Sequence, residues 1–558
     1  MSENSENTTP SLSQYFGRDS GASDQLDFTS NLSDTSNKLN TLKLDDNHLE
    51  PENKNEPVVC RLFLDNASQS KDPTAPFFDY FGSGPDAALN QNSVDKNAMM
   101  PNLDIPAMMD SGYESRVAVG SEAERRRDAW IPSEQTRQIL IKCVTSTPGT
   151  FFPERECLTM PGVLLEEELG DSVGEAVTVC LGEAEAAERR IITANDVTQD
   201  ERGLRELVQA GAYRAAINLT SRLLEIYGQG RGRAGHPSKH SSHSLQLWFT
   251  RIALLVKTKL FSIALAEAET FGELDKPDIF YQFYPEMYGD RPGSIASFSF
   301  RLLLAELPMH CGNFIDSLPR LFNLWSIVKQ IQNNLQAGLC EDGNQMGISE
   351  SDRSNSERLW RSREIRLVHS IIDCAICLKN FQLAIDLTKE ICEIDVANKH
   401  TLLSALGRLH LIVGDIVGAE TSFNKASSYT EEKGMKDRKL EVRSLIDRGL
   451  LCIANKNYNE ALNFFQEAKS IEPNKTMILN NMAVCHMYSG RLKDAISILE
   501  SAIAANPPQA LHESVILNLC TLYDMESSKG RMKKFALLRQ ISRYQADAPT
   551  TILEKLYG

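Results

Sequence analysis

Residues 461–473 read ALNFFQEAKSIEP, and residues 495–507 read AISILESAIAANP. Four pairs of positions correspond, each 34 residues apart: Ala461 with Ala495, Phe465 with Leu499, Ala468 with Ala502, and Pro473 with Pro507. This period, with small residues and a closing proline, is typical of tetratricopeptide repeats, in which each repeat is a pair of antiparallel helices. The sequence therefore predicts an all-α fold, a tetratricopeptide-type α-α solenoid (superhelix).

Weaker copies of the pattern precede these two stretches. Their corresponding positions hold Ala384, Gly407, Ala419, Phe423, Ala426 and Gly449. Two helices approach closely only where small residues face each other, so we expect Gly or Ala at each crossing. We expect the larger residues Phe423, Phe465 and Leu499 to fill the space between successive repeats, and each proline to end the second helix.

Composition divides the chain into segments of different character. Residues 1–120 are rich in Ser, Asn and Asp, which predicts a disordered acidic tail. The following segments are an irregular arm with short helices (121–200), divergent tetratricopeptide-like repeats (201–335), a polar loop (336–357), tetratricopeptide repeats (358–509), capping helices (510–545) and a short tail (546–558). Exposed insertions are expected at 228–244, 280–288 and 341–356.

The net charge of −16 is concentrated in the tail. Residues 1–120 carry 19 Asp and Glu against 8 Lys and Arg, a net of −11, which leaves −5 for the other 438 residues. Binding to nucleic acid needs clustered Lys and Arg, so this distribution argues against nucleic acid as a partner.

One short motif in the tail resembles a phosphodegron. Residues 110–115 have the form Asp-Ser-Gly-x-x-Ser, in which Ser111 and Ser115 would be the modified residues. Such a match also arises by chance in a sequence rich in Ser and Asp, and both interpretations stay open.

The sequence predicts a soluble intracellular protein. Residues 1–7 have neither a basic nor an apolar region, so no secretory signal is expected. No apolar run reaches the roughly eighteen residues that a membrane span needs. The 12 cysteines are scattered, and several fall within apolar helical patterns, as reduced core thiols do.

No motif in the sequence predicts catalysis, a metal site or a cofactor site. A Gly-x-x-x-x-Gly-Lys-Ser/Thr phosphate loop is absent. Cys374 and Cys377 form a single Cys-x-x-Cys without a second pair, which favours packing over zinc binding. His236, His240 and His243 lie in a Gly- and Ser-rich loop, where we expect solvated side chains. We therefore expect neither enzymatic activity nor a small-molecule substrate.

Several strings outside the repeat pattern resemble one family, subunit 12 of the TRAPP (transport protein particle) complexes. They are WIPS at 130–133, LTMPG at 158–162, DVTQDERGLR at 196–205, SLQLWF at 244–249, LWRSR at 359–363, NNMAVC at 480–485 and HESV at 512–515. The likeness runs from about residue 125 to 545 and is more specific than the repeat spacing.

This resemblance implies a non-catalytic scaffold subunit of a TRAPP III-type vesicle-tethering complex that acts in endoplasmic-reticulum-to-Golgi transport and autophagy. Its expected partners are the other TRAPP subunits and, indirectly, vesicle membranes and a Rab-family GTPase that the complex core activates. Its expected place is the cytoplasm, peripheral to the endoplasmic reticulum-Golgi intermediate compartment and the Golgi.

The alternative is a tetratricopeptide co-chaperone adaptor that binds C-terminal peptides of heat-shock proteins. The neighbouring Asn480 and Asn481 resemble the polar grip that such adaptors place on a C-terminal carboxylate. The regularly placed Lys and Arg residues that accompany this grip are not evident in the sequence.

Overall fold

The computed structural model describes residues 122–557, apart from residues 147–150, 152, 290, 346–348, 435–436 and 527–529. This part of the chain contains α-helices, short 3-10 helices and two isolated β-bridges. The prediction of an all-α fold is therefore confirmed. The predicted tail, with Ser111 and Ser115 of the phosphodegron-like motif, lies outside the described residues.

The first helices belong to the segment before residue 201, which we call the arm (residues 122–200). The arm contains α3 (Glu122–Asp128), α4 (Glu134–Thr145), a 3-10 turn at Arg155–Cys157, α5 (Ser172–Leu181) and α6 (Glu183–Ala187). Side chains outside the helices fix two of their starts, because Ser133 caps α4 and Asp171 caps α5.

The N-terminal half of the solenoid consists of three helix pairs and a short aromatic segment. The pairs are α7 (Glu201–Gln209) with α8 (Tyr213–Ile226), α9 (Ser242–Lys257) with α10 (Phe261–Ala268), and α12 (Phe298–His310) with α13 (Phe314–Gln336). Between α10 and α12 lie the 3-10 turns Glu269–Phe271, Pro277–Ile279 and Tyr281–Phe283 and the short helix α11 (Pro285–Tyr288).

Five further pairs form the C-terminal half. They are α14 (Glu350–Cys377) with α15 (Phe381–Ile394), α16 (Lys399–Val413) with α17 (Ile416–Glu432), α18 (Arg438–Ala454) with α19 (Tyr458–Ile471), α20 (Thr476–Tyr488) with α21 (Leu492–Ala505), and α23 (Glu513–Glu526) with α24 (Gly530–Tyr544). The short α22 (Pro507–Ala510) precedes α23, and α25 (Thr550–Tyr557) ends the described chain.

The tight turn has a recurring backbone conformation in the seven helix pairs from α7–α8 to α20–α21. Its central residue has a positive φ at Gly211, Lys259, Gly312, Lys379, Gly414, Lys456 and Gly490. Glycine adopts this conformation without steric cost. Lysine adopts this conformation only at a steric cost. The three lysines therefore show that packing of the helix pair sets the turn geometry.

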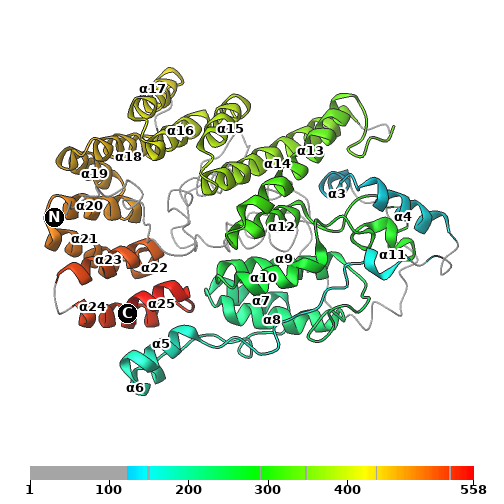
Figure 1. The fold of residues 1–558 in the computed structure, drawn as a ribbon, viewed down its shortest axis with the longest axis horizontal. Helices are drawn as coiled ribbons and strands as arrows, with labels where there is room; N and C mark the ends of the chain where they lie inside the picture. The colour runs from blue at the N-terminus through cyan, green and yellow to red at the C-terminus, as the bar shows by residue number, and fades with distance from the viewer. Residues whose placement is uncertain are drawn as a thin grey trace, which may run out of the picture.

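The solenoid curves until its two ends meet (Figure 1). The helices pass from α7 and α8 through α14 and α18 to α24 and α25, which lie beside α5 of the arm. Direct contacts join the two ends as well, since the Arg214 amide donates to Asp547 Oδ2 (2.8 Å) and Lys259 pairs with Glu513 (2.5 Å). The described chain therefore forms a closed ring rather than an open superhelix.

Two predicted segment boundaries were wrong. The expected polar loop over 336–357 is shorter, because α14 begins at Glu350, where the Ser349 side chain caps it. The expected short tail over 546–558 contains α25, which buries Ile552, Leu553 and Leu556 against the preceding helices. In both places tertiary packing stabilises a helix that the sequence pattern did not indicate.

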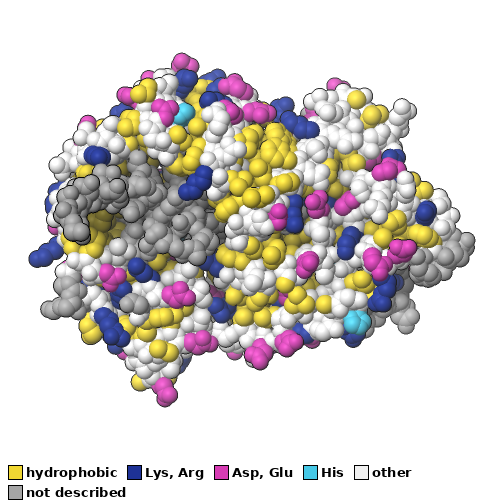
Figure 2. Space-filling model, in the orientation of Figure 1, with side chains coloured by type: hydrophobic (Ala, Val, Ile, Leu, Met, Phe, Trp, Pro, Cys, Tyr) yellow, Lys and Arg dark blue, Asp and Glu magenta, His cyan; other side chains and the backbone are white. Residues whose placement is uncertain are grey.

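Charges of both signs are interspersed over the face that Figure 2 shows. This mixture agrees with the near-balanced charge of residues 121–558 in the sequence. No helix among the described residues is long and apolar enough to cross a membrane.

Candidate functional site: the arm and the closed ring

The residues predicted at repeat positions lie at the helix crossings. Ala384, Ala419, Phe423, Ala461, Phe465, Ala468, Ala495 and Leu499 are buried, as are Gly407 and Gly449, whereas Ala426, Ala502 and Pro507 are half-buried and Pro473 is exposed. Each proline follows the end of a helix: Pro473 comes after α19, and Pro507 comes after α21 and begins α22. The buried positions of this set belong to the core of the helix pairs, whereas the prolines mark helix ends.

The aromatic residues pack differently from our expectation. We expected Phe423 and Phe465 to fill the space between successive repeats. Instead, a Cβ atom at Gly449 would lie 2.7 Å from the ring of Phe465, and Gly407 stands in the same relation to Phe423. Each phenylalanine therefore packs over the glycine of its own repeat, because only glycine leaves room for the ring.

Replacing Gly449 with Val is expected to destabilise the α18–α19 pair by about 1–3 kcal/mol, because the new side chain overlaps the buried Phe465 ring. Hydrogen exchange should report the loss as faster exchange of the α18 and α19 amides. Ala504→Val, on the exposed face of α21, is the control and should change little. Unchanged exchange in Gly449→Val would show that Phe465 can move aside.

The first contact of the arm is the WIPS segment. Trp130 is buried, and the guanidinium of Arg301 stacks 4.2 Å from its ring centroid. Nearby, Asp275 accepts a hydrogen bond from the Ser133 amide (3.0 Å), and Asp128 accepts hydrogen bonds from Tyr281 (3.1 Å) and Arg291 (2.7 Å). These contacts attach the start of the arm to the segment between α10 and α12.

The LTMPG segment makes the second contact, through a buried polar cluster. The Thr159 hydroxyl donates to Asp278 Oδ2 (2.6 Å) and lies 2.6 Å from His240 Nε2. Gln229 Nε2 lies 3.4 Å from His240 Nδ1, and Trp248 Nε1 donates to Gln229 Oε1 (2.7 Å), which fixes the amide orientation. Together these contacts fit a neutral His240 that carries its proton on Nε2, in agreement with burial, which lowers its pKa.

This cluster corrects two expectations about exposed insertions. We expected His240 to be solvated, but its side chain is fully buried, whereas His236 is exposed and His243 is half-exposed beside Glu201 (3.2 Å). We expected 280–288 to be an exposed insertion, but Phe280, Tyr281 and Tyr284 are buried. Each segment contains a side chain that contacts the arm, His240 in the first and Tyr281 in the second, although residues 232–237 are exposed as expected. A sequence pattern without a helical period does not reveal such contacts.

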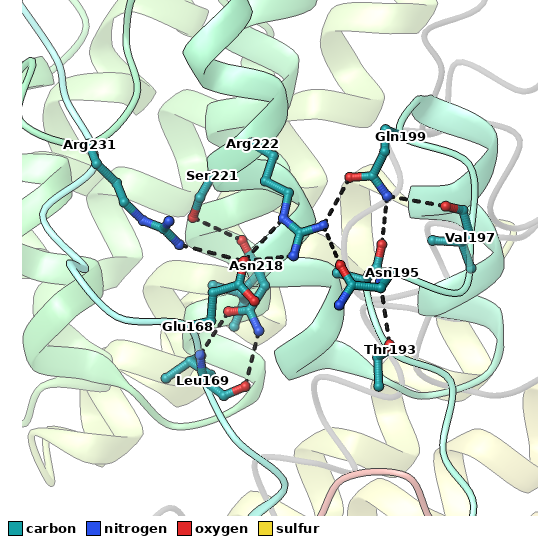
Figure 3. Close-up of polar contacts among 12 residues, drawn as sticks. Glu168, Leu169, Thr193, Asn195, Val197, Gln199, Asn218, Ser221, Arg222 and Arg231 are labelled. Atoms are coloured by element: carbon teal, nitrogen blue, oxygen red, sulfur yellow. Dashed lines mark hydrogen bonds and ion pairs between the residues drawn. The ribbon is translucent and has the colours of Figure 1, made fainter.

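The third contact lies on α8, where side chains hold the backbone of the arm (Figure 3). Asn218 accepts a hydrogen bond from the Leu169 amide (2.9 Å) and donates to the Leu169 carbonyl (3.0 Å). Arg222 donates to Glu168 Oε1 (2.7 Å), Asn195 Oδ1 (2.8 Å) and Gln199 Oε1 (3.1 Å). One arginine therefore joins Glu168, which precedes α5, to the segment that leads into α7.

The fourth contact closes the ring. Arg189 donates to the carbonyls of Ser542 (2.6 Å), Gln545 (2.9 Å) and Ala546 (2.6 Å), and it pairs with Asp171 (2.6 Å). Carbonyl groups at the C-terminal end of a helix lack intrahelical partners, so an arginine is well placed at the end of α24. We call these contacts, together with Arg214–Asp547, the junction.

Buried titratable groups elsewhere support the packing. Burial raises the pKa of Cys374 to about 12, with Asp373 and Glu306 as further causes. Cys374 is buried and Cys377 half-buried, so the Cys-x-x-Cys pattern belongs to the α14 packing. No group of three or more His, Cys, Asp or Glu within the described residues is arranged to hold a metal ion.

Acidification is expected to destabilise the protein through His369. Burial lowers the pKa of this side chain from 6.5 to about 4, so between these pH values the unfolded chain binds a proton that the folded chain does not. Stability is therefore full above pH 6.5 and falls by roughly 2–3 kcal/mol as the pH drops toward 4. Thermal melts over this range should show a shallower pH dependence for His369→Leu than for the native chain; equal slopes would contradict the assignment.

The asparagine pair is used within the fold. Asn480 Oδ1 accepts a hydrogen bond from Asn518 Nδ2 of the neighbouring pair (2.7 Å), and Asn481 is buried. This contact occupies Asn480 Oδ1, whereas a carboxylate would accept a hydrogen bond from Asn480 Nδ2.

Solved structures with likeness to this chain include human IFIT1 and yeast Tom70. IFIT1 is 12% identical with a TM-score of 0.31, covering 67% of this chain and 73% of that chain. Tom70 is 12% identical with a TM-score of 0.27, covering 73% of each chain. These scores are too low to support any functional comparison.

Sequence comparison is more informative. The tetratricopeptide repeat family matches residues 453–516. Mouse trafficking protein particle complex subunit 12 is 40% identical over 436 residues, which make up 78% of this chain and 54% of the mouse protein. The human protein of the same name is 39% identical over 436 residues and is covered to 59%, so the chain spans just over half the length of these relatives. Over the aligned residues, this tetratricopeptide-repeat chain is therefore similar to trafficking protein particle complex subunit 12 of mouse and human.

Proposed function

We propose that the chain is a non-catalytic scaffold subunit of a TRAPP III-type vesicle-tethering complex. The observation that carries the proposal is its 40% identity over 436 residues to a protein named as a subunit of the trafficking protein particle complex. In this role it would act in endoplasmic-reticulum-to-Golgi transport and autophagy, bind other subunits, and support activation of a Rab-family GTPase by the complex core. Its place would be the cytoplasm, at the intermediate compartment and the Golgi.

The arrangement of polar groups supports a binding role over a catalytic one. Thr159, His240 and Asp278 have the residue types of a nucleophile, a base and an orienting acid. All three are buried, however, and their hydrogen bonds to one another hold the Thr159 segment of the arm in place. A substrate has no access to the Thr159 hydroxyl, so this cluster is structural.

The co-chaperone alternative has less support. The relatives are named for a trafficking complex, and Asn481, one of the two asparagines that would hold a carboxylate, is buried. A closed ring with an ordered outer surface instead suits a subunit that holds several protein neighbours in fixed positions.

Co-purification tests the proposed function. The tagged full-length chain should elute from gentle cell extracts together with identified subunits of the trafficking particle, well ahead of its own mass of 62.3 kDa. Elution as a monomer alone, with no such subunit in the fraction, would contradict the proposal.

A further inference from the structure

Exposed apolar and basic side chains gather at the C-terminal end of the ring. On α24, Met532 is 70% exposed and Tyr544 53% exposed. The basic residues Arg531, Arg539 and Arg543 are also exposed, and successive members of the three lie eight and four positions apart, which places them on one side of the helix. At the lower left of Figure 2, over α24 and α5, hydrophobic side chains lie beside charged side chains of both signs.

Helix α5 of the arm extends this surface. Its inner residues Val173 and Val177 pack into the same core as Leu537 of α24, while Val179 on its outer side is 84% exposed. The charge of Arg531 reaches the neighbouring Cys180, where it counteracts the rise in thiol pKa that burial causes. We call the exposed side chains of Val179, Arg531, Met532, Arg539, Arg543 and Tyr544 the C-terminal face.

The C-terminal face depends on the closed ring. Its two segments lie more than 350 residues apart in sequence, and Arg189 joins them through the carbonyls at the end of α24. Arg539 pairs with Glu185 of α6 (3.0 Å), which adds a second link across the same boundary. The face therefore exists as one surface only while the arm is bound.

The composition of this face matches that of the centre of a protein interface. Met, Tyr and Arg are enriched in such centres, while Lys, Glu and Asp are depleted. Other strongly exposed apolar side chains, such as Ile315 (74%) and Val417 (75%), lie on different helices of the solenoid.

The charge of the face indicates the kind of partner. The whole chain has a net charge of −16, yet the charged side chains of the C-terminal face are three arginines, of which only Arg539 has an ion-pair partner within the described part of the chain, Glu185. No carboxylate of the described residues forms an ion pair with Arg531 or Arg543, although Lys533 and Lys534 on the same helix both have such partners. We propose that the C-terminal face binds a protein surface with an apolar centre and a rim of Asp and Glu. This inference rests on the proposed function, since that partner would be another subunit of the trafficking particle.

A charge-inserting variant tests the face with little risk to the fold, because the altered side chains are exposed. The full-length Val179→Glu/Met532→Glu protein is compared with the native chain for co-elution with purified, identified particle subunits. At least a tenfold loss of bound subunits is expected. Ile315→Glu/Val417→Glu is the matched control, with equally exposed residues far from the face, and should bind as the native chain does.

The outcomes separate this inference from the proposed function. A native chain that binds no particle subunit overturns both. A native chain that binds, together with a face variant that binds equally well, overturns the inference alone. Loss of binding in the control as well as in the face variant also overturns it. A native chain that forms a dimer, or pellets with phosphatidylserine vesicles, through these same residues assigns the face to another occupant and overturns the inference.

Discussion

Replacing Arg251 with Ala is expected to destabilise the N-terminal repeats by about 3–5 kcal/mol, the range found when one partner of a buried ion pair is removed. Arg251 and Glu267 are both 0% exposed, and two hydrogen bonds of 2.5 and 2.8 Å join them. Arg251 also donates to Ser221 (2.8 Å) and to the Ile217 carbonyl (3.0 Å). Its loss leaves the Glu267 carboxylate buried without a cation.

The effect should be local. Each helix pair contacts mainly its neighbours, so stability is lost first in the pairs that contain the change. Hydrogen exchange should rise in α8, α9 and α10, and also at the Leu164 amide of the arm, which donates to Glu267 (3.0 Å). The amides of α20 and α21 should exchange as before.

A second variant distinguishes lost charge balance from lost packing. In Arg251→Met/Glu267→Gln both charges are absent, while the amide oxygen still accepts a hydrogen bond from Leu164. This pair should regain more than half of the stability lost in Arg251→Ala. Lys389→Ala, which removes an exposed ion pair with Asp386, is the surface control and should cost less than about 1 kcal/mol. A double variant no more stable than Arg251→Ala would show that packing sets the cost.

The sequence predicted the repeats well, for a physical reason. A helix pair needs small residues where the helices cross, and this requirement recurs at a fixed period, as at Ala461 and Ala495. The turn residues were an overlooked signal, because Gly211, Gly312, Gly414 and Gly490 occupy the same place in their pairs. This signal was obscured because the other three turns hold Lys259, Lys379 and Lys456, and lysine is not expected at positive φ.

The contacts of the arm and the closure of the ring were not predictable from a repeat period. Thr159, His240 and Asp278 come from three segments, each without a helical or strand period, and only the fold brings them together. The resemblance to a family marked the LTMPG segment as specific but did not indicate what it contacts. Long-range polar contacts such as Arg189 with Gln545 leave no periodic trace in a sequence.

Replacing Arg189 with Ala is expected to open the ring at the junction. Its side chain is 2% exposed, and its loss leaves Asp171 without its cation and removes the arginine donor from the carbonyls of Ser542, Gln545 and Ala546. Hydrogen bonds to a charged group contribute about 1.5–3 kcal/mol each, so the junction should lose roughly 3 kcal/mol or more. Hydrogen exchange should rise in α5, α25 and the last turn of α24, and small-angle scattering should show a larger radius of gyration.

The ring should open at the junction because the other contacts between neighbouring helix pairs are apolar. One hydrophobic core extends from Trp130 to Cys485, and a second joins α5 to α20–α25, with no side chain of α7 or α8 in it. The ends of the ring are thus joined mainly by polar groups. Removing one arginine should therefore destabilise the contact between the ends far more than the packing of the helix pairs along the solenoid. Arg190→Ala is the matched control. Arg190 directly follows Arg189 but is exposed, so its replacement should leave the ring closed. If Arg189→Ala instead raised exchange equally in α14 to α20, Arg189 would stabilise the whole solenoid, and the junction would not be its weakest boundary.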